Sequence, residues 1–215
     1  MSEISLVFLK PEVAMQPAVS ARIIEQLLQE PSLELTCFKQ VRISDELARE
    51  HYAEHAEKPF FPKLLAQVES GPIIAMIFRG EGAVSTIREL CGATFVENAD
   101  PTSLRGNYGI IKGLNAVHAS DSPESGEREV MLWKEQADLE EDASAAQESA
   151  NAYVTQWKDA GTNTSPTIRA LCTGPLDDKR RAKIRKIFAA ANIGTDVTPQ
   201  EIENIIDVID TTLNE

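Results

Sequence analysis

The stretch from residue 73 to residue 79 constrains the fold most, because it is apolar at nearly every position and follows the break Ser70-Gly71-Pro72. A strand of this kind carries apolar side chains on both faces, so it is stable only inside a sheet that is covered on both sides. The sequence therefore predicts a strand at residues 73–79 in the centre of a sheet.

Strands and helices alternate along the first 135 residues. Residues 4–9 form a short apolar run that ends at Lys10, and residues 33–43 alternate polar and apolar side chains as an antiparallel strand does. Between Pro17 and Pro31, apolar residues recur at helical spacing. The other predicted elements are helices at 44–55, 64–69, 82–91 and 122–133, a strand at 104–111 and a long irregular stretch at 93–103. This order predicts an α+β sandwich of ferredoxin-like type, an antiparallel sheet with helices.

The composition changes after residue 135. Residues 135–151 are rich in Glu, Asp, Ala, Ser and Gln and contain almost no large apolar residues, which is typical of a solvated helix or linker. Two amphipathic helices, at 178–190 and 199–213, close the chain. We therefore predict a domain at 1–135, an acidic linker and packing segment at 136–175, and a small all-helical extension at 176–215.

The overall charge is strongly negative. A formal net charge of -13 over 215 residues argues against binding to nucleic acid or to anionic membranes, since a phosphate-binding surface needs the opposite sign. A basic pocket inside an acidic shell is compatible with this charge. Cys37, Cys91 and Cys172 lack CxxC spacing, and no signal-peptide or transmembrane pattern is present, so we expect reduced thiols and a cytoplasmic protein.

One segment combines a histidine with groups that can assist it. His118 lies between Asn115 and Ser120, and Glu129 follows on a helix that begins at Pro123. A carboxylate that accepts a hydrogen bond from one imidazole nitrogen leaves the other nitrogen free as a nucleophile. A lone histidine is more often structural, and a helical glutamate is more often a surface charge. The combination favours phosphate chemistry.

Other residues suit a nucleotide. Arg88 and Arg105 flank the irregular stretch, and guanidinium groups match phosphate oxygens, although surface ion pairs are their commoner role. Phe60 and Phe61 either belong to the core or offer a face on which a base stacks. The sequence has neither GxxxxGK[ST] nor GxGxxG, so a glycine-rich loop is excluded as the phosphate site.

These residues resemble the signature of the nucleoside diphosphate kinase family. The motif Asn-x-x-His-x-Ser-Asp stands at 115–121, Lys10-Pro11 is similar to the family's Lys-Pro after its first strand, and the likeness extends over residues 4–134. It implies a ferredoxin-like fold and a phosphotransferase with His118 as nucleophile, Glu129 as its orienting group and Lys10 as a further catalytic residue. It also implies a nucleotide site formed by Lys10, Tyr52, Phe60, Leu64, Arg88, Thr94, Arg105, Asn115 and Ser120.

The resemblance implies nucleoside tri- and diphosphates as partners. By this resemblance, Mg²⁺ enters with the nucleotide phosphates, and the protein builds no metal site of its own. Three places depart from the family pattern: Glu12-Val13, Thr94-Phe95-Val96, and Lys112, where a small apolar residue is usual. The second departure falls in a loop that builds oligomer contacts in the family, so the sequence leaves a homo-oligomer open.

The C-terminal extension at 176–215 permits a different interpretation of the function. Residues 101–105 and the C-terminal helices resemble divergent family members associated with cilia and flagella. The alternative to an enzyme is therefore a non-catalytic or weakly catalytic kinase-like scaffold in a larger assembly such as an axoneme.

The two C-terminal helices resemble a single degenerate EF-hand. Calcium needs about six to eight oxygen ligands, beginning with acidic side chains at the first, third and fifth loop positions. Those positions are Ala190, Asn192 and Gly194, while Val197 stands at the loop's hydrophobic position and Glu201 at its closing carboxylate. Only about two side-chain ligands remain, which is too few to replace the water around the ion. We expect no calcium binding, and a helix pair within 176–215 that docks on the first domain or on a protein partner. A self-contained helical hairpin is the plain alternative.

Overall fold

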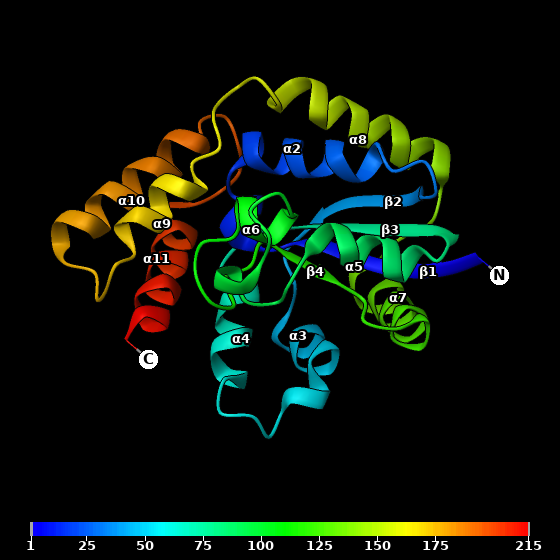
Figure 1. Cartoon of the computed structure of the whole chain (residues 1–215), viewed down its shortest axis with the longest axis horizontal. Coiled ribbons are helices and arrows are strands. Elements are labelled where there is room, and N and C mark those ends of the chain that lie inside the picture. Colours follow the sequence, from blue (N-terminus) through cyan, green and yellow to red (C-terminus); the bar gives the residue numbers. More distant parts are fainter. Residues whose placement is uncertain (1, 215) are drawn as a thin grey trace.

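A four-stranded antiparallel sheet forms the centre of the protein. The computed structural model describes residues 2–214. The strands are β1 (Ser2–Leu9), β2 (Glu34–Val41), β3 (Ile73–Glu81) and β4 (Val117–Ala119), in the order β2-β3-β1-β4 (Figure 1). The apolar stretch at 73–79 lies in β3, which β2 and β1 flank, so the predicted central strand is confirmed.

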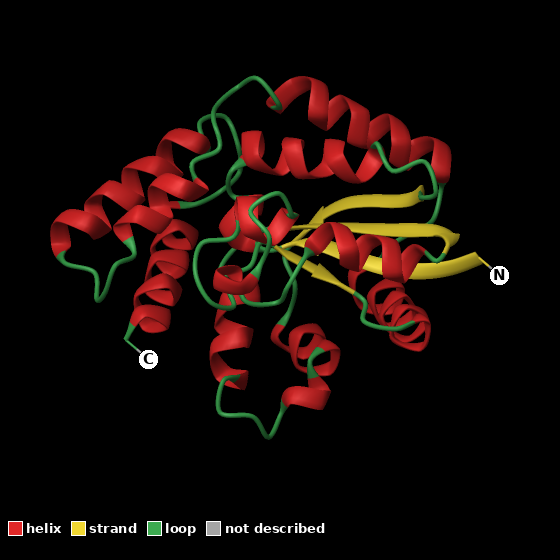
Figure 2. Ribbon diagram, in the orientation of Figure 1, coloured by secondary structure: helices red, strands yellow, loops and turns green. Residues whose placement is uncertain are grey.

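Helices cover both faces of this sheet, as Figure 2 shows. Strand β1 supplies both cores, since Leu6 and Phe8 point to one face while Val7 and Leu9 point to the other. The first face is covered by α3 (Asp45–His51), α4 (Phe61–Val68) and α7 (Pro123–Ala137), and the second by α2 (Pro17–Leu28), α5 (Ala83–Cys91), α6 (Leu104–Tyr108) and α8 (Ala143–Trp157). Short elements complete this part: α1 (Pro11–Ala14), η1 (Ala53–His55) and η2 (Val96–Asn98). The predicted α+β ferredoxin-like fold is confirmed.

The strand predicted at 104–111 is wrong, because this segment begins with helix α6 and the fourth strand is β4. Ser103 caps the helix, with its Oγ accepting a hydrogen bond from the amide of Gly106 at 3.2 Å. Leu104 and Tyr108 are four residues apart, so both lie on one helical face and are buried in the core. That spacing fits a helical turn as well as an alternating strand, and the cap decides for the helix.

Helix α8 begins within the acidic stretch, at Ala143, and packs on α2 and β2. Asp142 caps its first turn, and Ala146 and Ala150 are buried in the core beside the sheet. Small side chains at these positions allow the helix backbone to approach closely. From residue 143 onward, the polar residues of this stretch therefore belong to the outer face of a packed helix.

Three further helices, α9 (Ser165–Leu171), α10 (Asp178–Ala191) and α11 (Pro199–Leu213), lie together at one end of the molecule (Figure 1). Their apolar core includes Met15, Ile110 and Leu114 of the first part of the chain. The extension therefore docks on the sheet-containing domain. This is the first of the two arrangements predicted for the helix pair, the other being docking on a protein partner. Over residues 2–214, no helix combines the length and the apolar character needed to cross a membrane.

The loop between α10 and α11 uses its polar groups for folding. Glu201 forms a capping box with Thr198, and its carboxylate also accepts from Arg42 at 2.5 Å. Asn192 donates through its amide to the carbonyls of Met15 and Phe188. These bonds engage side chains that an EF-hand would turn toward calcium, and the absence of calcium binding stays a prediction.

Candidate active site

His118 stands on the short edge strand β4, opposite Phe8 of β1. Its ring stacks on the Phe8 ring with the centroids 4.5 Å apart, and only 16% of the side chain is exposed. The His118 Nε2 lies 3.0 Å from Oε2 of Glu129. Since this bond uses Nε2, Nδ1 is the ring nitrogen that can act as a nucleophile.

Glu129 is held from two directions on helix α7. The helix starts at Pro123 after the cap Ser122, and this start brings Glu129 beneath β4. Its Oε2 also accepts a hydrogen bond from Ser120 Oγ at 2.8 Å, and that hydroxyl in turn accepts from the amide of Leu6. Burial alone would raise the pKa of Glu129, but the charge and hydrogen bond of His118 outweigh it and lower this pKa. The predicted grouping of His118, Ser120 and Glu129 is present in the structure.

His51 is a further member of this cluster that sequence reasoning missed. Its ring meets His118 edge to face with the centroids 4.6 Å apart, and the indole of Trp133 donates to its Nδ1 at 3.2 Å. Burial lowers the pKa of His51 well below its usual value, so the ring is neutral. His51 lies on the buried face of α3. A histidine on such a face is interpreted from sequence as a core residue, and no sequence signal marks this one as part of the site.

His51, His118 and Glu129 each place one ligand atom within 4.8 Å of the others. This spacing would also suit a metal ion. However, the Glu129 oxygen is already bonded to His118 and Ser120. We therefore interpret the cluster as the support that fixes the His118 ring.

His118 opens into a cavity of about 460 Å³. Four of the side chains that line this cavity are lysine or arginine. The lining residues all lie within 2–214, and none of them is an aspartate or a glutamate. The four are Lys10, Lys63, Arg105 and Lys112. In a chain with a net charge of -13, this is the basic pocket inside an acidic shell that the sequence left open. Such a cavity suits a polyanion.

Lys10 enters the cavity from the end of β1, as the resemblance implied. Its Nζ donates to the carbonyl of Gly113 at 3.4 Å, and the side chain is buried. Burial lowers the pKa of Lys10 to about 8, with Glu12 opposing this shift and Arg105 adding to it. Glu12, which the sequence showed only as a departure from the family, is buried and accepts from Gln67 and from the amide of Ala116. The charge of Glu12 favours the ammonium form of Lys10, and its bond to Ala116 fixes the backbone next to Asn115.

Arg105 and Asn115 are both fixed by backbone carbonyls. The Arg105 guanidinium donates to Val117 and Gly92, which holds it beside β4. The Asn115 amide donates to the carbonyl of Thr94 at 2.7 Å, so Thr94 and Asn115 stand side by side on the cavity wall. These contacts preorganise donors around His118.

The far part of the cavity is more apolar. Phe60 is 48% exposed and lines it together with Leu64 from α4. Tyr52 lines the cavity nearer to His118, with the two ring centroids 6.2 Å apart. Its buried hydroxyl has no hydrogen-bond partner among residues 2–214, and neither has Oδ1 of Asn115. Buried polar atoms are rarely left unpaired, so these two atoms are candidates to bind a ligand.

Arg88 is the one predicted nucleotide-binding side chain, apart from Ser120 beneath His118, that does not line this cavity. It lies exposed on the last turns of α5. Its positive charge contributes to the lowered pKa of Asp121, after the larger effect of the hydrogen bond from Ser125. A phosphate contact from Arg88 therefore requires its side chain to turn toward the cavity.

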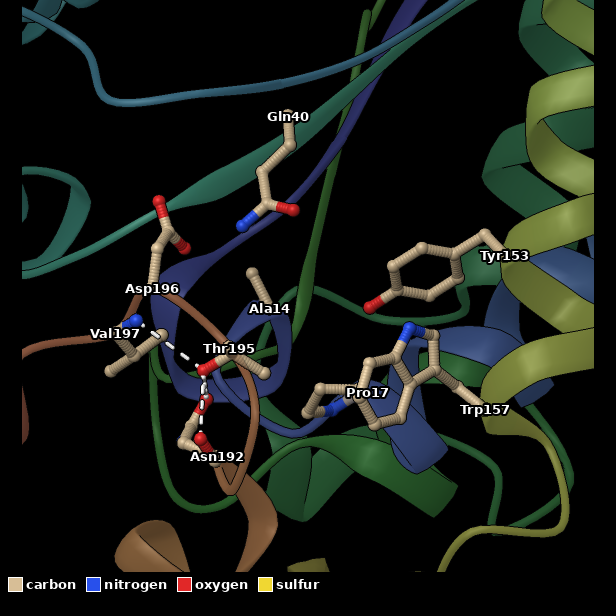
Figure 3. Close-up of a pocket in the computed structure, with 9 residues that line it drawn as sticks. All are labelled: Ala14, Pro17, Gln40, Tyr153, Trp157, Asn192, Thr195, Asp196 and Val197. Carbon is tan, nitrogen blue, oxygen red and sulfur yellow. Dashed lines mark hydrogen bonds between the residues drawn. The ribbon is translucent and has the colours of Figure 1, made fainter.

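A second, smaller cavity of about 130 Å³ lies between α8 and the loop that joins α10 to α11. Figure 3 shows Tyr153 and Trp157 on one side and Asn192, Thr195 and Asp196 on the other. Asp196 is the only lining residue with a carboxylate, and it forms an ion pair with Arg42 at 2.8 Å. This cavity offers no nucleophile with an adjacent base, so we place the chemistry at His118.

A family model described as nucleoside diphosphate kinase matches residues 3–139 of this chain. The match spans more than half of the sequence, and it includes His118, Glu129 and all nine residues predicted for the nucleotide site. The chain belongs to the nucleoside diphosphate kinase family. The predicted family resemblance is confirmed, and helices α8 to α11 lie beyond the matched segment.

Members of the nucleoside diphosphate kinase family are similar to this chain in sequence and in structure. A nucleoside diphosphate kinase of Synechococcus is 40% identical over 137 residues, which are 64% of this chain and 91% of that protein. A nucleoside diphosphate kinase of Methanothermobacter thermautotrophicus is 42% identical over 137 residues, 64% of this chain and 90% of that protein. The structure of a halophilic nucleoside diphosphate kinase from Halobacterium salinarum in complex with CDP covers 67% of this chain and 97% of that chain, with 38% identity and a TM-score of 0.60.

Proposed function

We propose that this chain is an active nucleoside diphosphate kinase, which transfers the terminal phosphate of a nucleoside triphosphate to a nucleoside diphosphate. In the first step Nδ1 of His118 attacks the γ-phosphorus, a nitrogen–phosphorus bond forms, and the bond to the β-phosphate oxygen breaks. The nucleoside diphosphate leaves. In the second step a terminal oxygen of another diphosphate attacks the phosphohistidine, which restores the free imidazole.

One observation carries this proposal. The buried carboxylate of Glu129 is hydrogen-bonded to one nitrogen of His118, and the His118 ring faces a cavity that is lined by lysines and an arginine and, within residues 2–214, by no carboxylate. This geometry suits a nucleophile for an anionic substrate. The CDP complex of the Halobacterium salinarum relative supports a nucleotide as the ligand.

The cavity residues have separate tasks in this mechanism. Lys10 and Arg105 neutralise the charge that develops on phosphate oxygens, with Arg88 joining them once its side chain turns inward. Thr94, Asn115 and Tyr52 supply uncharged polar contacts, and Phe60 and Leu64 hold the base. Ser120 and Glu129 keep the imidazole ring in position.

Magnesium belongs to the substrate in this proposal. Mg²⁺ is commonly bound by one or two carboxylates together with substrate phosphates. Since the cavity wall carries no carboxylate within residues 2–214, the residues present suit a Mg²⁺–nucleotide complex whose phosphates hold the ion.

A kinase-like scaffold in an assembly such as an axoneme remains the alternative. The acidic extension and the altered loop at Thr94-Phe95-Val96 are the features that favour it. Either function is compatible with a homo-oligomer. The two differ in turnover: an idle scaffold binds nucleotides without exchanging their phosphates.

An exchange assay tests the proposal. Purified full-length chain with ATP, Mg²⁺ and CDP is expected to form CTP and ADP, measured by chromatography of the nucleotides. Without an acceptor, γ-labelled ATP is expected to leave an acid-labile, base-stable label on the protein. Absence of both products at micromolar enzyme would refute the enzymatic proposal and favour the scaffold.

Broad base acceptance is expected from this site. Stacking on Phe60 is largely independent of the base, whereas hydrogen bonds to a base edge would discriminate by about 1–3 kcal/mol each. Rates with ATP, GTP, CTP and UTP as donors should therefore agree within about tenfold. A single strongly preferred base in this comparison would contradict the stacking model.

Triphosphate affinity should depend on pH through Lys10. Its pKa is lowered to about 8 in the folded protein, so the ammonium is charged below that pH and loses its charge above it. We expect the KM for ATP to rise between pH 7 and pH 9 in the wild type. The variant Lys10→Met should show a high KM that no longer responds to pH in this window. An equal pH response in both proteins would assign the effect to another group.

A further inference from the structure

Helix α11 lines the nucleotide cavity, although it lies outside the segment that matches the kinase family. The family match ends at residue 139, whereas α11 comprises Pro199–Leu213. Val208 and Thr212 of this helix nevertheless line the same cavity as His118 and Phe60. One wall of the site is therefore built by residues that the shared kinase segment does not contain.

Lys112 ties this wall to the kinase-like domain. Its Nζ donates to the backbone carbonyl of Thr212 in the last turn of α11 at 2.9 Å. The last carbonyls of a helix lack intrahelical donors and carry partial negative charge, so a lysine is favoured there. The departure from the small apolar residue usual at position 112 thus has a structural reason in this chain.

Apolar packing fixes the same contact. Ile110 and Leu114, which flank Lys112, are buried in one cluster with Ile205 and Ile209 of α11. Helix α11 also packs against α4, the helix that carries Leu64. The turn at 110–114 leads directly into Asn115, so the position of α11 and the position of the cavity wall depend on each other.

We infer that α11 contacts the nucleoside part of the bound nucleotide, so that nucleotide binding and docking of the C-terminal extension stabilise each other. The identity of the ligand rests on the proposed function. Val208 and Thr212 are uncharged, and the ammonium group of Lys112 beside them is engaged by the Thr212 carbonyl. The Arg105 guanidinium, in contrast, is bonded to the carbonyl of Val117, next to His118. The phosphates therefore belong near His118, and the sugar and base are left to face α11.

Enlarging the α11 side chains tests this contact directly. In the full-length protein, Val208→Phe and Thr212→Met are expected to raise the Kd for ADP about tenfold or more, because the added atoms occupy cavity space. Thr211→Met is the matched control, since this neighbouring side chain is exposed and does not line the cavity. The kcat at saturating ATP should change far less than KM. Unchanged Kd in both cavity variants would overturn the inference.

Hydrogen exchange in the unmodified protein provides a second measurement that does not depend on any variant folding. ADP is expected to slow exchange of amides in α11, while amides in α8 serve as the internal reference. Wild-type protein that binds ADP without protecting α11 would overturn this inference and leave the proposed function intact. Protein that binds ADP with protection of α11 but transfers no phosphate would support the inference and refute the enzyme. Protein that binds no ADP would overturn both.

Discussion

Replacement of His118 by alanine is expected to abolish the labelled phosphoprotein and to reduce phosphate exchange by at least about 10⁴-fold. The His118 imidazole is held by the buried carboxylate of Glu129 while it faces the cationic wall of the cavity. Removing it deletes the covalent intermediate and leaves only substrate positioning. Exchange of label between ATP and CDP, together with acid-labile phosphate on the protein, measures both effects.

His55→Ala is the matched control for this experiment. His55 also lines the cavity, but its ring is partly exposed and stands beside Phe60 with the centroids 5.5 Å apart. We expect this variant to retain the phosphoprotein and most of the exchange rate. Equal labelling of the His118→Ala protein and the wild type would remove His118 as the nucleophile.

The sequence was sufficient for the elements that have a strong local pattern. The apolar stretch at 73–79 predicted β3, and the spacing of Asn115, His118 and Ser120 predicted a site on one short segment. The family resemblance assigned Glu129 to His118, and the structure places it on the helix that begins at Pro123. The structure brings His118 and Ser120 within hydrogen-bonding distance of Glu129.

The parts that the sequence did not predict depend on tertiary contacts. Leu104 and Tyr108 fit both a strand and a helix, and only the Ser103 cap and burial against the core select α6. His51 reads as a core residue until its distance to His118 is known. The contribution of Thr212 to the cavity arises from packing between residues about a hundred positions apart, which no local pattern encodes.

Polar composition was also a weak guide to burial. Residues 135–151 read as solvated because charged and small residues dominate them, yet Ala146 and Ala150 of α8 are buried. Alanine carries little hydrophobic signal, so a helix that packs through alanines has a low apolar contrast between its faces. The exposed acidic residues around them determine the composition but not the packing.

Glu129→Gln is expected to reduce phosphate exchange by about 100-fold or more while leaving the fold intact. The amide keeps the shape of the side chain but loses the negative charge that faces His118, and it can present a donor to Nε2 in place of an acceptor. The imidazole then has less preference for the tautomer with a free Nδ1. Glu127→Gln, an exposed change on the same helix, is the matched control and should keep wild-type activity.

The pH profile separates this charge effect from a loss of packing. The pKa of Glu129 in the folded protein lies below its ordinary value of 4.5. The ionised carboxylate therefore contributes fully to the stability of the fold above pH 4.5, and this contribution is lost only as the pH falls through the lowered pKa. The melting temperature of the wild type should therefore fall in acid relative to that of Glu129→Gln, with the difference appearing below pH 4.5 as the carboxylate takes up a proton. Near neutral pH the variant should remain folded and show the low exchange rate. A wild-type exchange rate in this variant would show that the buried carboxylate only fills space, whereas melting temperatures that respond equally to pH in both proteins would assign the acid effect to another group.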